Sequence, residues 1–335
     1  MKKKSICVIS GDGIGPEVME VSLQVIKALK LNFEIKREAA GYSAWQKSGD
    51  SLPAHTLRTC NNCDAVLFGA VTTPPHIKNY LSPIIRLRKE LDLYANIRPF
   101  FSLPINNTVQ GLDFVIVREN SQGLYSGIEK RITDGYMALR IITRKASARI
   151  IRQAFLQALK RRRKVVVVHK ANVLRLTDGL FLKQARQISA EYKDVDYFEM
   201  LVDNCAFQLI KNPKQFDVIV TTNMFGDILS DEAAGLVGGL GVVASANIGP
   251  KHALFEPVHG SAPKYVGQNK VNPIAMLSAV GMMLEYLSIT KKANLLKKVI
   301  ISALKNGIVT YDLGGKYKTS DVVEYIIKQI NLLTI

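Results

Sequence analysis

Short apolar runs alternate along the chain with longer segments in which apolar residues recur at helical spacing. The runs have the length of strands, and the segments between them are long enough for amphipathic helices. This alternation is typical of an α/β protein with a largely parallel sheet. The predicted strands are 5–10, 65–70, 114–117, 165–168 and 218–220, and the predicted helices include 16–31, 143–160, 178–192 and 273–287.

The chain is 335 residues long, which allows two modest lobes or one large domain. No apolar run approaches the roughly 18 residues that a membrane-spanning helix needs. Basic residues 2–4 are followed by an apolar stretch that is too short for a secretory signal. Cys60 and Cys63 have C-x-x-C spacing but no second pair or matching histidines, which favours a helix-to-strand connection over a metal or redox site. We therefore expect a cytoplasmic protein with reduced thiols and no membrane partner.

The net charge of +17 is the unusual feature of the composition. A charge of this sign is compatible with binding of nucleic acid, an anionic surface or acidic small molecules. The densest basic run, residues 160–164, ends a predicted helix and has no interleaved aromatic residues on which bases could stack. A solvated helix end is therefore favoured, and we expect no nucleic-acid partner.

The first predicted strand runs into the glycine-rich segment GDGIGPE at residues 11–17. A dinucleotide fingerprint would require a third glycine where the chain has Pro16, and a strand-ending acid about 20 residues later. Neither is clearly present. A proline that follows three glycines indicates a turn and a helix N-terminus, which alone is weak support for phosphate binding.

Asp227 and Asp231 are four residues apart and share one face of the helix that they open. Two neighbouring carboxylates repel each other unless a cation lies between them, and hard oxygen ligands favour magnesium or manganese. Acids near a helix N-terminus also balance the helix dipole. The spacing alone does not distinguish these two roles.

Three arginines, Arg88, Arg98 and Arg118, lie near the ends of predicted elements. The guanidinium group grips carboxylates with two parallel hydrogen bonds, which a lysine cannot do. A surface salt bridge is the alternative for any one of them, but an arginine that ends an apolar strand is more often directed at a site. Lys170 follows the strand 165–168, where a buried amine with a lowered pKa could act as a base.

Six segments along the chain have distinctive sequences: GDGIGPE at 11–17, RKELDLYANIRP at 88–99, RENSQGLYSG at 118–127, HKANVLRLTDGLF at 169–181, NMFGDILSDEAAGLVGGLG at 223–241 and EPVHGSAPKYVGQNKVNP at 256–273. Through these segments, from residue 5 to about residue 330, the chain resembles the β-decarboxylating dehydrogenases, the family of isocitrate, homoisocitrate and 3-isopropylmalate dehydrogenases. The resemblance implies an α/β fold distinct from the Rossmann type, with a large domain from 1–98 and 239–335 and a small domain from 99–238. It also implies a homodimer that is clasped through the small domains, with active sites shared between subunits in the clefts between domains.

This resemblance implies that a 2-hydroxy acid is oxidised and then loses carbon dioxide. Arg88, Arg98 and Arg118 match the arginines that bind the substrate carboxylates. Lys170 matches a lysine that crosses the dimer to take part in hydroxyl deprotonation, and Tyr125 matches the tyrosine that protonates the enol. A catalytically inactive regulatory relative is an alternative, which the presence of all these residues opposes. The matching ligands of Mg²⁺ or Mn²⁺ are Asp227 and Asp231 of one subunit and Asp203 of the other.

The resemblance also implies a cofactor site. Family members that use NAD usually carry an aspartate in the segment where this chain has Lys264 and Tyr265, a pair that matches the 2′-phosphate contacts of NADP enzymes. Tyr311 matches a third contact, but the arginine expected four residues later is Gly315, with Lys316 a possible replacement. We therefore expect NADP, with NAD possible. The expected cofactor residues are Thr72, Thr73, Glu256, His259, Gly260, Lys264, Tyr265, Asn272 and Tyr311.

The substrate is the least determined part of this interpretation. Ser82 matches the serine that contacts the distal carboxylate of isocitrate, but the asparagine expected two residues later is Ile84. A lysine found in some isocitrate enzymes is Phe68 here, and segments 81–85 and 202–206 look closer to homoisocitrate enzymes. Isocitrate therefore ranks first, homoisocitrate a near second, and isopropylmalate third because Ser82 is polar.

Overall fold

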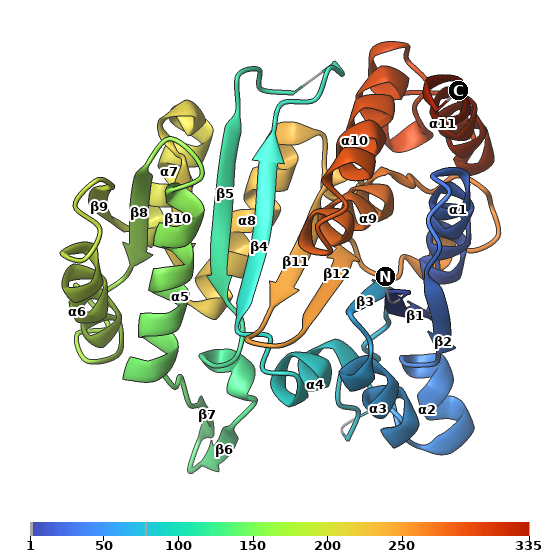
Figure 1. Cartoon of the computed structure of the whole chain (residues 1–335). Helices are drawn as coiled ribbons and strands as arrows, with labels where there is room; N and C mark the ends of the chain where they lie inside the picture. The colour runs from blue at the N-terminus through green and yellow to red at the C-terminus, as the bar shows by residue number, and fades with distance from the viewer. Residues whose placement is uncertain (1–2, 78, 107, 335) are drawn as a thin grey trace.

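The computed structural model describes residues 3–77, 79–106 and 108–334. Its central feature is a ten-stranded sheet in the order β2-β1-β3-β12-β11-β4-β5-β10-β8-β9 (Figure 1). Strands β2, β1, β3 and β12 at one end of the sheet pair in parallel, and so do β5, β10, β8 and β9 at the other end. In the middle, β11 is antiparallel to β12 and β4, and β4 is antiparallel to β5. The strands are β1 (Ser5–Gly11), β2 (Glu34–Glu38), β3 (Ala65–Ala70), β4 (Ala95–Phe101), β5 (Asp113–Glu119), β8 (Lys164–His169), β9 (Asp196–Leu201), β10 (Val218–Thr221), β11 (Ala244–Ile248) and β12 (Ala253–Pro257), with a separate hairpin of β6 (Glu129–Ile132) and β7 (Gly135–Ala138).

Helices cover both faces of the sheet, as the sequence predicts for an α/β fold. In the view of Figure 1, α5, α9 and α10 lie in front of the sheet, while α8 lies behind β4 and β5. The helices are α1 (Gly15–Ala28), α2 (Tyr42–Ser48), α3 (Ala54–Asn62), α4 (Pro83–Glu90), α5 (Arg144–Ala158), α6 (Thr177–Ser189), α7 (Val202–Lys211), α8 (Asn223–Val237), α9 (Ile274–Tyr286), α10 (Thr290–Lys305) and α11 (Thr319–Leu333).

Buried β-branched residues explain why the parallel strands form. Every residue of β3 and β10 is buried, and so are the four consecutive valines of β8. Strands that are apolar on both faces need cover on both sides. On one side of β8 and β10 this cover comes from α5, whose Ile150, Ala154 and Phe155 are fully buried in the same core cluster.

The five strands predicted from the sequence are confirmed, with ends that differ by at most a residue or two. The connection role of Cys60 and Cys63 is also confirmed, because Cys60 lies in the last turn of α3 and Cys63 follows that helix just before β3. The prediction missed the other five strands of the sheet, β2, β4, β9, β11 and β12, and the hairpin of β6 and β7, each of which is short or interrupted by polar residues. Helix 16–31 ends early, at Ala28, because the backbone turns into the left-handed region at Lys30.

The interpretation of residues 160–164 as a solvated helix end is correct only in part, because Lys160, Arg162 and Arg163 are exposed but Arg161 is partly buried. Helix α5 ends at Ala158, and the basic run forms the turn that leads into β8. Within it, Arg161 donates to Asp113 at 2.7 Å and to the fully buried Asp217 at 2.9 Å. At least this part of the basic run therefore neutralises a buried carboxylate instead of facing solvent.

The predicted domain boundary at residues 98 and 99 falls inside β4, which pairs with β11 on one side and β5 on the other. The second predicted boundary follows the end of α8 at Val237. The division into a large and a small domain stays a prediction. In the part of the chain that the structure describes, no helix has both the length and the apolar character needed to cross a membrane.

Candidate active site

The three predicted substrate arginines converge on one face of the sheet. Arg98 lies on β4 and Arg118 on β5, and the register pairs Arg118 with Asn96, two residues before Arg98. Both arginine side chains therefore point to the same face, where Arg88 joins them from α4. All three residues are at most 9% exposed. Burial, together with repulsion from Arg98 and Arg88, lowers the pKa of Arg118 to about 10.

Two acids of α8 supply the negative charge that these arginines need. Arg98 Nη2 lies 3.4 Å from Oδ1 of Asp227, and its Nη1 lies 3.3 Å from Oδ1 of Asp231. Arg118 also donates to Oδ1 of Asp227, and the Tyr125 hydroxyl donates to Oδ2 of the same residue. The prediction that both acids share one helix face is confirmed. Within the single chain, however, the cation between them is a guanidinium group.

The pKa values of the two carboxyl groups, Asp227 and Asp231, are shifted in opposite directions. Burial alone would raise the pKa of Asp227, but Arg118 and the Tyr125 hydrogen bond outweigh it and hold this pKa below its ordinary value. For Asp231, burial prevails over the nearby Arg98, so its pKa is raised. Burial and the hydrogen bond to Asp227 raise the pKa of Tyr125. At neutral pH the tyrosine therefore keeps its proton and can act as a proton donor.

A buried network that the sequence analysis did not identify holds Arg88 in place. Oδ1 of Asn247, on β11, accepts from Arg88 Nε at 3.1 Å and from Asn96 Nδ2 at 2.8 Å. Asn247 Nδ2 donates to Glu256 Oε1 at 2.7 Å, and Arg88 Nη2 donates to the same oxygen at 3.0 Å. Glu256, predicted as a cofactor residue, thus also pairs with a substrate arginine. The alternation of Ser245 and Asn247 with small apolar residues was the available sequence signal.

A cavity of about 190 Å³ lies beside this cluster. Phe68 and Ile84, the two apolar replacements noted in the sequence, contribute to its wall. Nε2 of His259 is buried and has no hydrogen-bond partner among the described residues, which leaves a polar atom for a ligand to satisfy. The predicted site residues that line the cavity are Thr73, Ser82, Arg88, Arg98, Glu256, His259 and Gly260.

The glycine-rich turn after β1 holds two loops of this site together. A Cβ atom at Gly13 would lie 2.0 Å from the carbonyl oxygen of Ser261, so only glycine fits there. The buried Asp12 carboxylate accepts from the backbone nitrogens of Thr72, at 2.9 Å, and Tyr42, at 2.7 Å. Thr72 Oγ1 in turn lies 2.7 Å from Ser261 Oγ. In this structure the turn therefore acts as a support for the predicted cofactor residue Thr72.

The other predicted cofactor residues lie outside the cavity. Lys264 and Tyr265 are exposed in the short 3₁₀ helix η4 (Pro263–Tyr265), with the Lys264 amine 5.0 Å from the centre of the tyrosine ring. Tyr311 is exposed at the start of η5 (Tyr311–Leu313). Asn272 Nδ2 donates to Asp312 Oδ2 at 3.0 Å and so ties its segment to η5.

Lys170 and Asp203 form a separate pair. Lys170 Nζ lies 2.6 Å from Asp203 Oδ1, with side chains that are 27% and 62% exposed. In the single chain the Lys170 side chain is only partly buried, so burial of its amine at a shared active site stays a prediction. The hydrogen bond from Lys170 lowers the pKa of Asp203. Among the described residues, no three acids, histidines or cysteines of one chain gather as a metal site, so Asp203 does not join Asp227 and Asp231 here.

The sequence pattern of the family described as isocitrate/isopropylmalate dehydrogenase matches residues 5–326. The chain is 47% identical to homoisocitrate dehydrogenase of Methanocaldococcus jannaschii, and the match covers 97% of each chain. It is 46% identical to 3-isopropylmalate dehydrogenase of Methanothermobacter thermautotrophicus, with 98% and 99% covered.

Solved structures give the same result as the sequence comparisons. The crystal structure of isocitrate dehydrogenase from Methylococcus capsulatus superimposes with a TM-score of 0.95 at 41% identity, and the match covers 98% of this chain and 99% of the other. The predicted family and fold are thus confirmed. The chain belongs to the isocitrate/isopropylmalate dehydrogenase family, whose members are hydroxy-acid dehydrogenases that catalyse oxidative decarboxylation.

Proposed function

We propose that this protein oxidises and decarboxylates homoisocitrate with NADP and a divalent metal ion. The observation that carries this proposal is the convergence of Arg88, Arg98 and Arg118 on the side of the sheet where Asp227 and Tyr125 are hydrogen-bonded to each other. Buried guanidinium groups bind carboxylates with fixed geometry. In the chain alone, Asp227 and Glu256 balance the positive charge of the arginines. A substrate with several carboxylates would bind to the same guanidinium groups and balance that charge instead.

Different residues are proposed to carry out the binding and the proton-transfer steps of the reaction. The arginines hold the carboxylates so that the hydroxyl-bearing carbon has one orientation. Tyr125, whose raised pKa keeps it protonated, donates a proton to the carbon that has lost carbon dioxide. Lys170 of the partner subunit takes the hydroxyl proton. A bound NADP would supply the hydride acceptor for the oxidation of the substrate carbon.

Asp227 and Asp231 fit one half of a divalent metal site. They offer hard oxygen ligands from one helix face, and the Asp231 side chain is 53% exposed and therefore accessible. A bound Mg²⁺ or Mn²⁺ supplies Lewis acidity that favours ionisation of the substrate hydroxyl. A third carboxylate is expected from Asp203 of the partner subunit.

Exposed apolar side chains support a homodimer with shared sites. Tyr136 on β7 is 78% exposed, and Ile132 and Met137 of the same hairpin are also exposed. Phe207 and Ile210 on α7 expose a second apolar surface on the helix that carries Asp203. Apolar surface of this kind is typical of an interface. A partner that covers α7 could bring Lys170 and Asp203 to the second active site.

The preference for NADP rests on Lys264, which has no carboxylate within ion-pair distance among the described residues. Its charge is thus free to bind a 2′-phosphate. The arginine missing at Gly315 has a structural reason, because a Cβ atom there would lie 2.0 Å from the carbonyl oxygen of Val309. Exchanging Lys264→Asp and Tyr265→Ile together should lower kcat/KM for NADP about ten- to hundredfold relative to NAD. Lys270→Asp, an exposed lysine of the same loop, is the control.

The cavity wall favours homoisocitrate over isocitrate, which ranked first from the sequence. Homoisocitrate has one more methylene group in its distal arm, and Phe68 and Ile84 offer apolar contacts to it next to the hydroxyl of Ser82. The first relative described above is also a homoisocitrate dehydrogenase. Isocitrate remains the second candidate because Ser82 lines the same cavity as Arg88 and Arg98.

A spectrophotometric assay at the absorbance of the reduced cofactor tests the proposal with all three hydroxy acids and both cofactors. We expect the highest kcat/KM with homoisocitrate and NADP. Ile84→Asn should shift the preference toward isocitrate by about tenfold, since a polar group replaces the apolar contact. Ile85→Asn, which does not line the cavity, should leave it unchanged. Absence of turnover with every combination would contradict the proposed function.

A further inference from the structure

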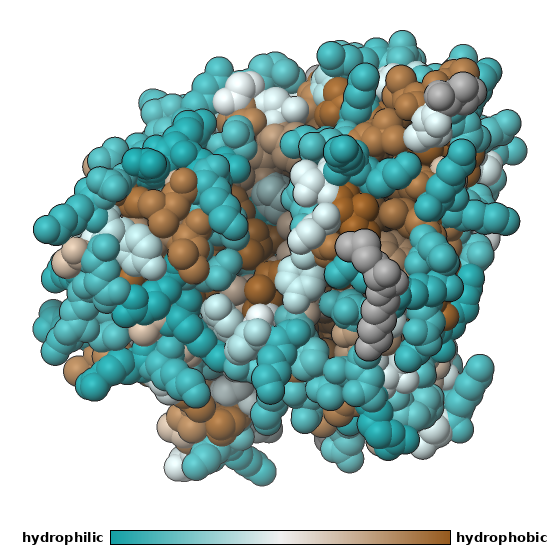
Figure 2. Space-filling model, viewed as in Figure 1, coloured by the Kyte–Doolittle hydropathy of each residue, from teal (hydrophilic) through white to brown (hydrophobic). Residues whose placement is uncertain are grey.

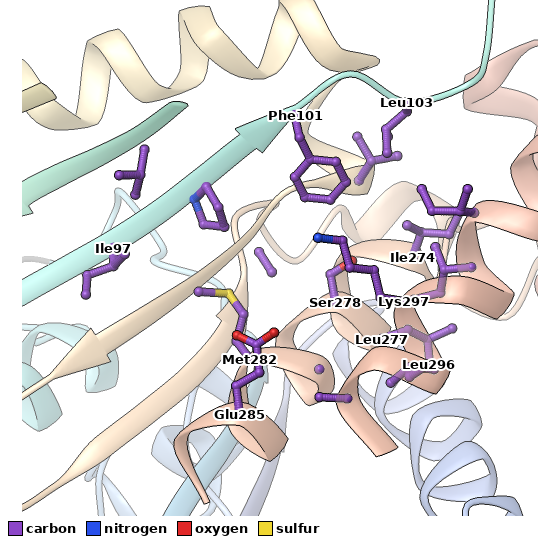
Figure 3. A pocket seen from close by; sticks show the side chains of 18 of the residues that line it. Ile97, Phe101, Leu103, Ile274, Leu277, Ser278, Met282, Glu285, Leu296 and Lys297 are labelled. Carbon is purple, nitrogen blue, oxygen red and sulfur yellow. The ribbon is translucent and has the colours of Figure 1, made fainter. Parts of the chain in front are cut away.

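A second cavity, of about 480 Å³, lies on the opposite face of the sheet from the arginine cluster. Its walls come from β4 and β5 on one side and from α9 and α10 on the other (Figure 3). On the face shown in Figure 2, apolar residues gather along the strip between α5 and α10, where this cavity opens. The volume falls within the range of roughly 300–1,000 Å³ that is usual for small-molecule sites.

The inner wall of this cavity is apolar. Ile97 and Phe101 of β4 face Leu277, Leu296 and Ile300 of the two helices. Successive side chains of a strand point to opposite faces, so Ile97 lies on one side of β4 and Arg98 on the other. A ligand held here would contact the strand that carries a substrate arginine without entering the active site.

The charged groups at the cavity are not all paired. Asp113 and Arg161 bind each other at 2.7 Å. Lys297 instead lies with its amine 5.0 Å from the centre of the Phe101 ring, and Figure 3 shows it turned toward that ring. Neither Lys297 nor Glu285 has an ion-pair partner among the described residues. Both residues are exposed, so the cavity presents one unpaired cation and one unpaired anion at its solvent-facing rim, beside an apolar interior.

We propose that this cavity binds a free α-amino acid with an apolar side chain. Its carboxylate binds Lys297, its ammonium group binds Glu285, and its side chain enters the apolar interior. A simple carboxylate would leave Glu285 unpaired next to a like charge, and a simple amine would do the same at Lys297. A zwitterion satisfies both residues at once, which selects this chemical class. The binding needs neither substrate nor cofactor and so stands apart from the proposed activity.

The test is calorimetric titration of the full chain with L-leucine and with two matched probes, 4-methylpentanoate and 3-methylbutylamine, which each lack one of the charges. We expect L-leucine to bind with a Kd on the order of 0.1–1 mM, and each probe to bind at least about tenfold more weakly. Gly281 lines the cavity, and a Cβ atom added there meets nothing within 4 Å. Gly281→Leu should therefore fill the cavity and abolish binding, while Gly281→Ala should retain it, and a thermal melt of both variants checks that the fold is intact.

The charge variants Lys297→Gln and Glu285→Gln should each weaken L-leucine binding about five- to tenfold. A thermal melt of each variant checks that the fold is intact. No heat of binding up to about 20 mM L-leucine would overturn the proposal, as would equal binding to the wild type and Gly281→Leu. Equally tight binding of 4-methylpentanoate would overturn the choice of a zwitterion.

Discussion

The arginine–carboxylate cluster and the Lys170–Asp203 pair both join opposite charges, but they differ in what surrounds them. Asp227 contacts two buried arginines and Tyr125 within the same chain. Lys170 and Asp203 contact each other through side chains that are partly or largely exposed. An exposed pair of this kind contributes little to stability. The stability of the fold is therefore a sufficient reason for the buried arginine–carboxylate cluster, but not for the Lys170–Asp203 pair.

The difference has a simple explanation if each active site is built from two subunits. The buried cluster is complete as a binding site for carboxylates, and the chain can assemble it alone. On this explanation, Lys170 is the proposed base and Asp203 the proposed metal ligand, and both would reach a substrate only when a partner covers α7. Each of the following experiments tests whether these two groups act as parts of one site.

Removal of the metal ion should have the largest effect. Asp227, Asp231 and the partner's Asp203 are expected to bind it together, so excess EDTA should reduce turnover to background and Mn²⁺ or Mg²⁺ should restore it. The sequence suggested that an uncompensated acidic cluster would require the metal. This reason is wrong, because in the structure Arg98 already contacts both acids of α8 and offsets their negative charge. The fold should therefore survive EDTA, with an unchanged circular dichroism spectrum, and full turnover in EDTA would contradict the metal site.

Loss of the proton-transfer groups should have the next largest effect. We expect Lys170→Met and Tyr125→Phe each to lower kcat by roughly 10²–10⁴-fold, because acid–base groups commonly contribute that much. The matched controls are Lys193→Met and Tyr286→Phe, both exposed residues outside the proposed site and interface. Stopped-flow measurement should find hydride transfer slowed in Lys170→Met, and mainly later steps slowed in Tyr125→Phe. A loss smaller than about tenfold in either variant would argue against its role.

The spacing rules for helices and strands were sufficient for part of this site. Asp227 and Asp231 share a helix face because they are four residues apart. The convergence of Arg98 and Arg118 depends instead on the antiparallel pairing of β5 with β4, a strand that the sequence analysis did not predict. The contacts of Asn247 could not be predicted, since they depend on β11 lying between β4 and β12, a pairing between segments about 150 residues apart. Periodicity describes one element at a time, whereas this network depends on sheet order.

Mixing two inactive variants separates the shared-site explanation from a site within one chain. In a heterodimer of Lys170→Met and Asp231→Asn chains, one active site carries both changes and the other carries neither. Random subunit exchange makes about half of the dimers mixed, so activity should recover to about a quarter of the wild-type value. Size-exclusion chromatography and mass spectrometry of tagged chains should verify the mixing. Proven heterodimers without activity would show that Lys170 and Asp231 serve the same chain's site.

The smallest expected effect distinguishes the two acids of α8 by stability alone. The lowered pKa of Asp227 means that its charge stabilises the fold above the ordinary pKa of about 4, and that this contribution is lost as the pH falls through the lowered value. The raised pKa of Asp231 has the opposite sign, since its charge costs stability at neutral pH and protonation relieves that cost. Asp227→Asn should therefore reduce the free energy of unfolding by about 1–3 kcal/mol at pH 7, whereas Asp231→Asn should change it by less than about 0.5 kcal/mol. Urea unfolding at fixed protein concentration measures both changes in the free energy of unfolding, and their difference should narrow as the pH is lowered below about 4. Equal losses at pH 7 would mean that Arg98, which contacts both acids, governs their energetics more than Arg118 and Tyr125 do.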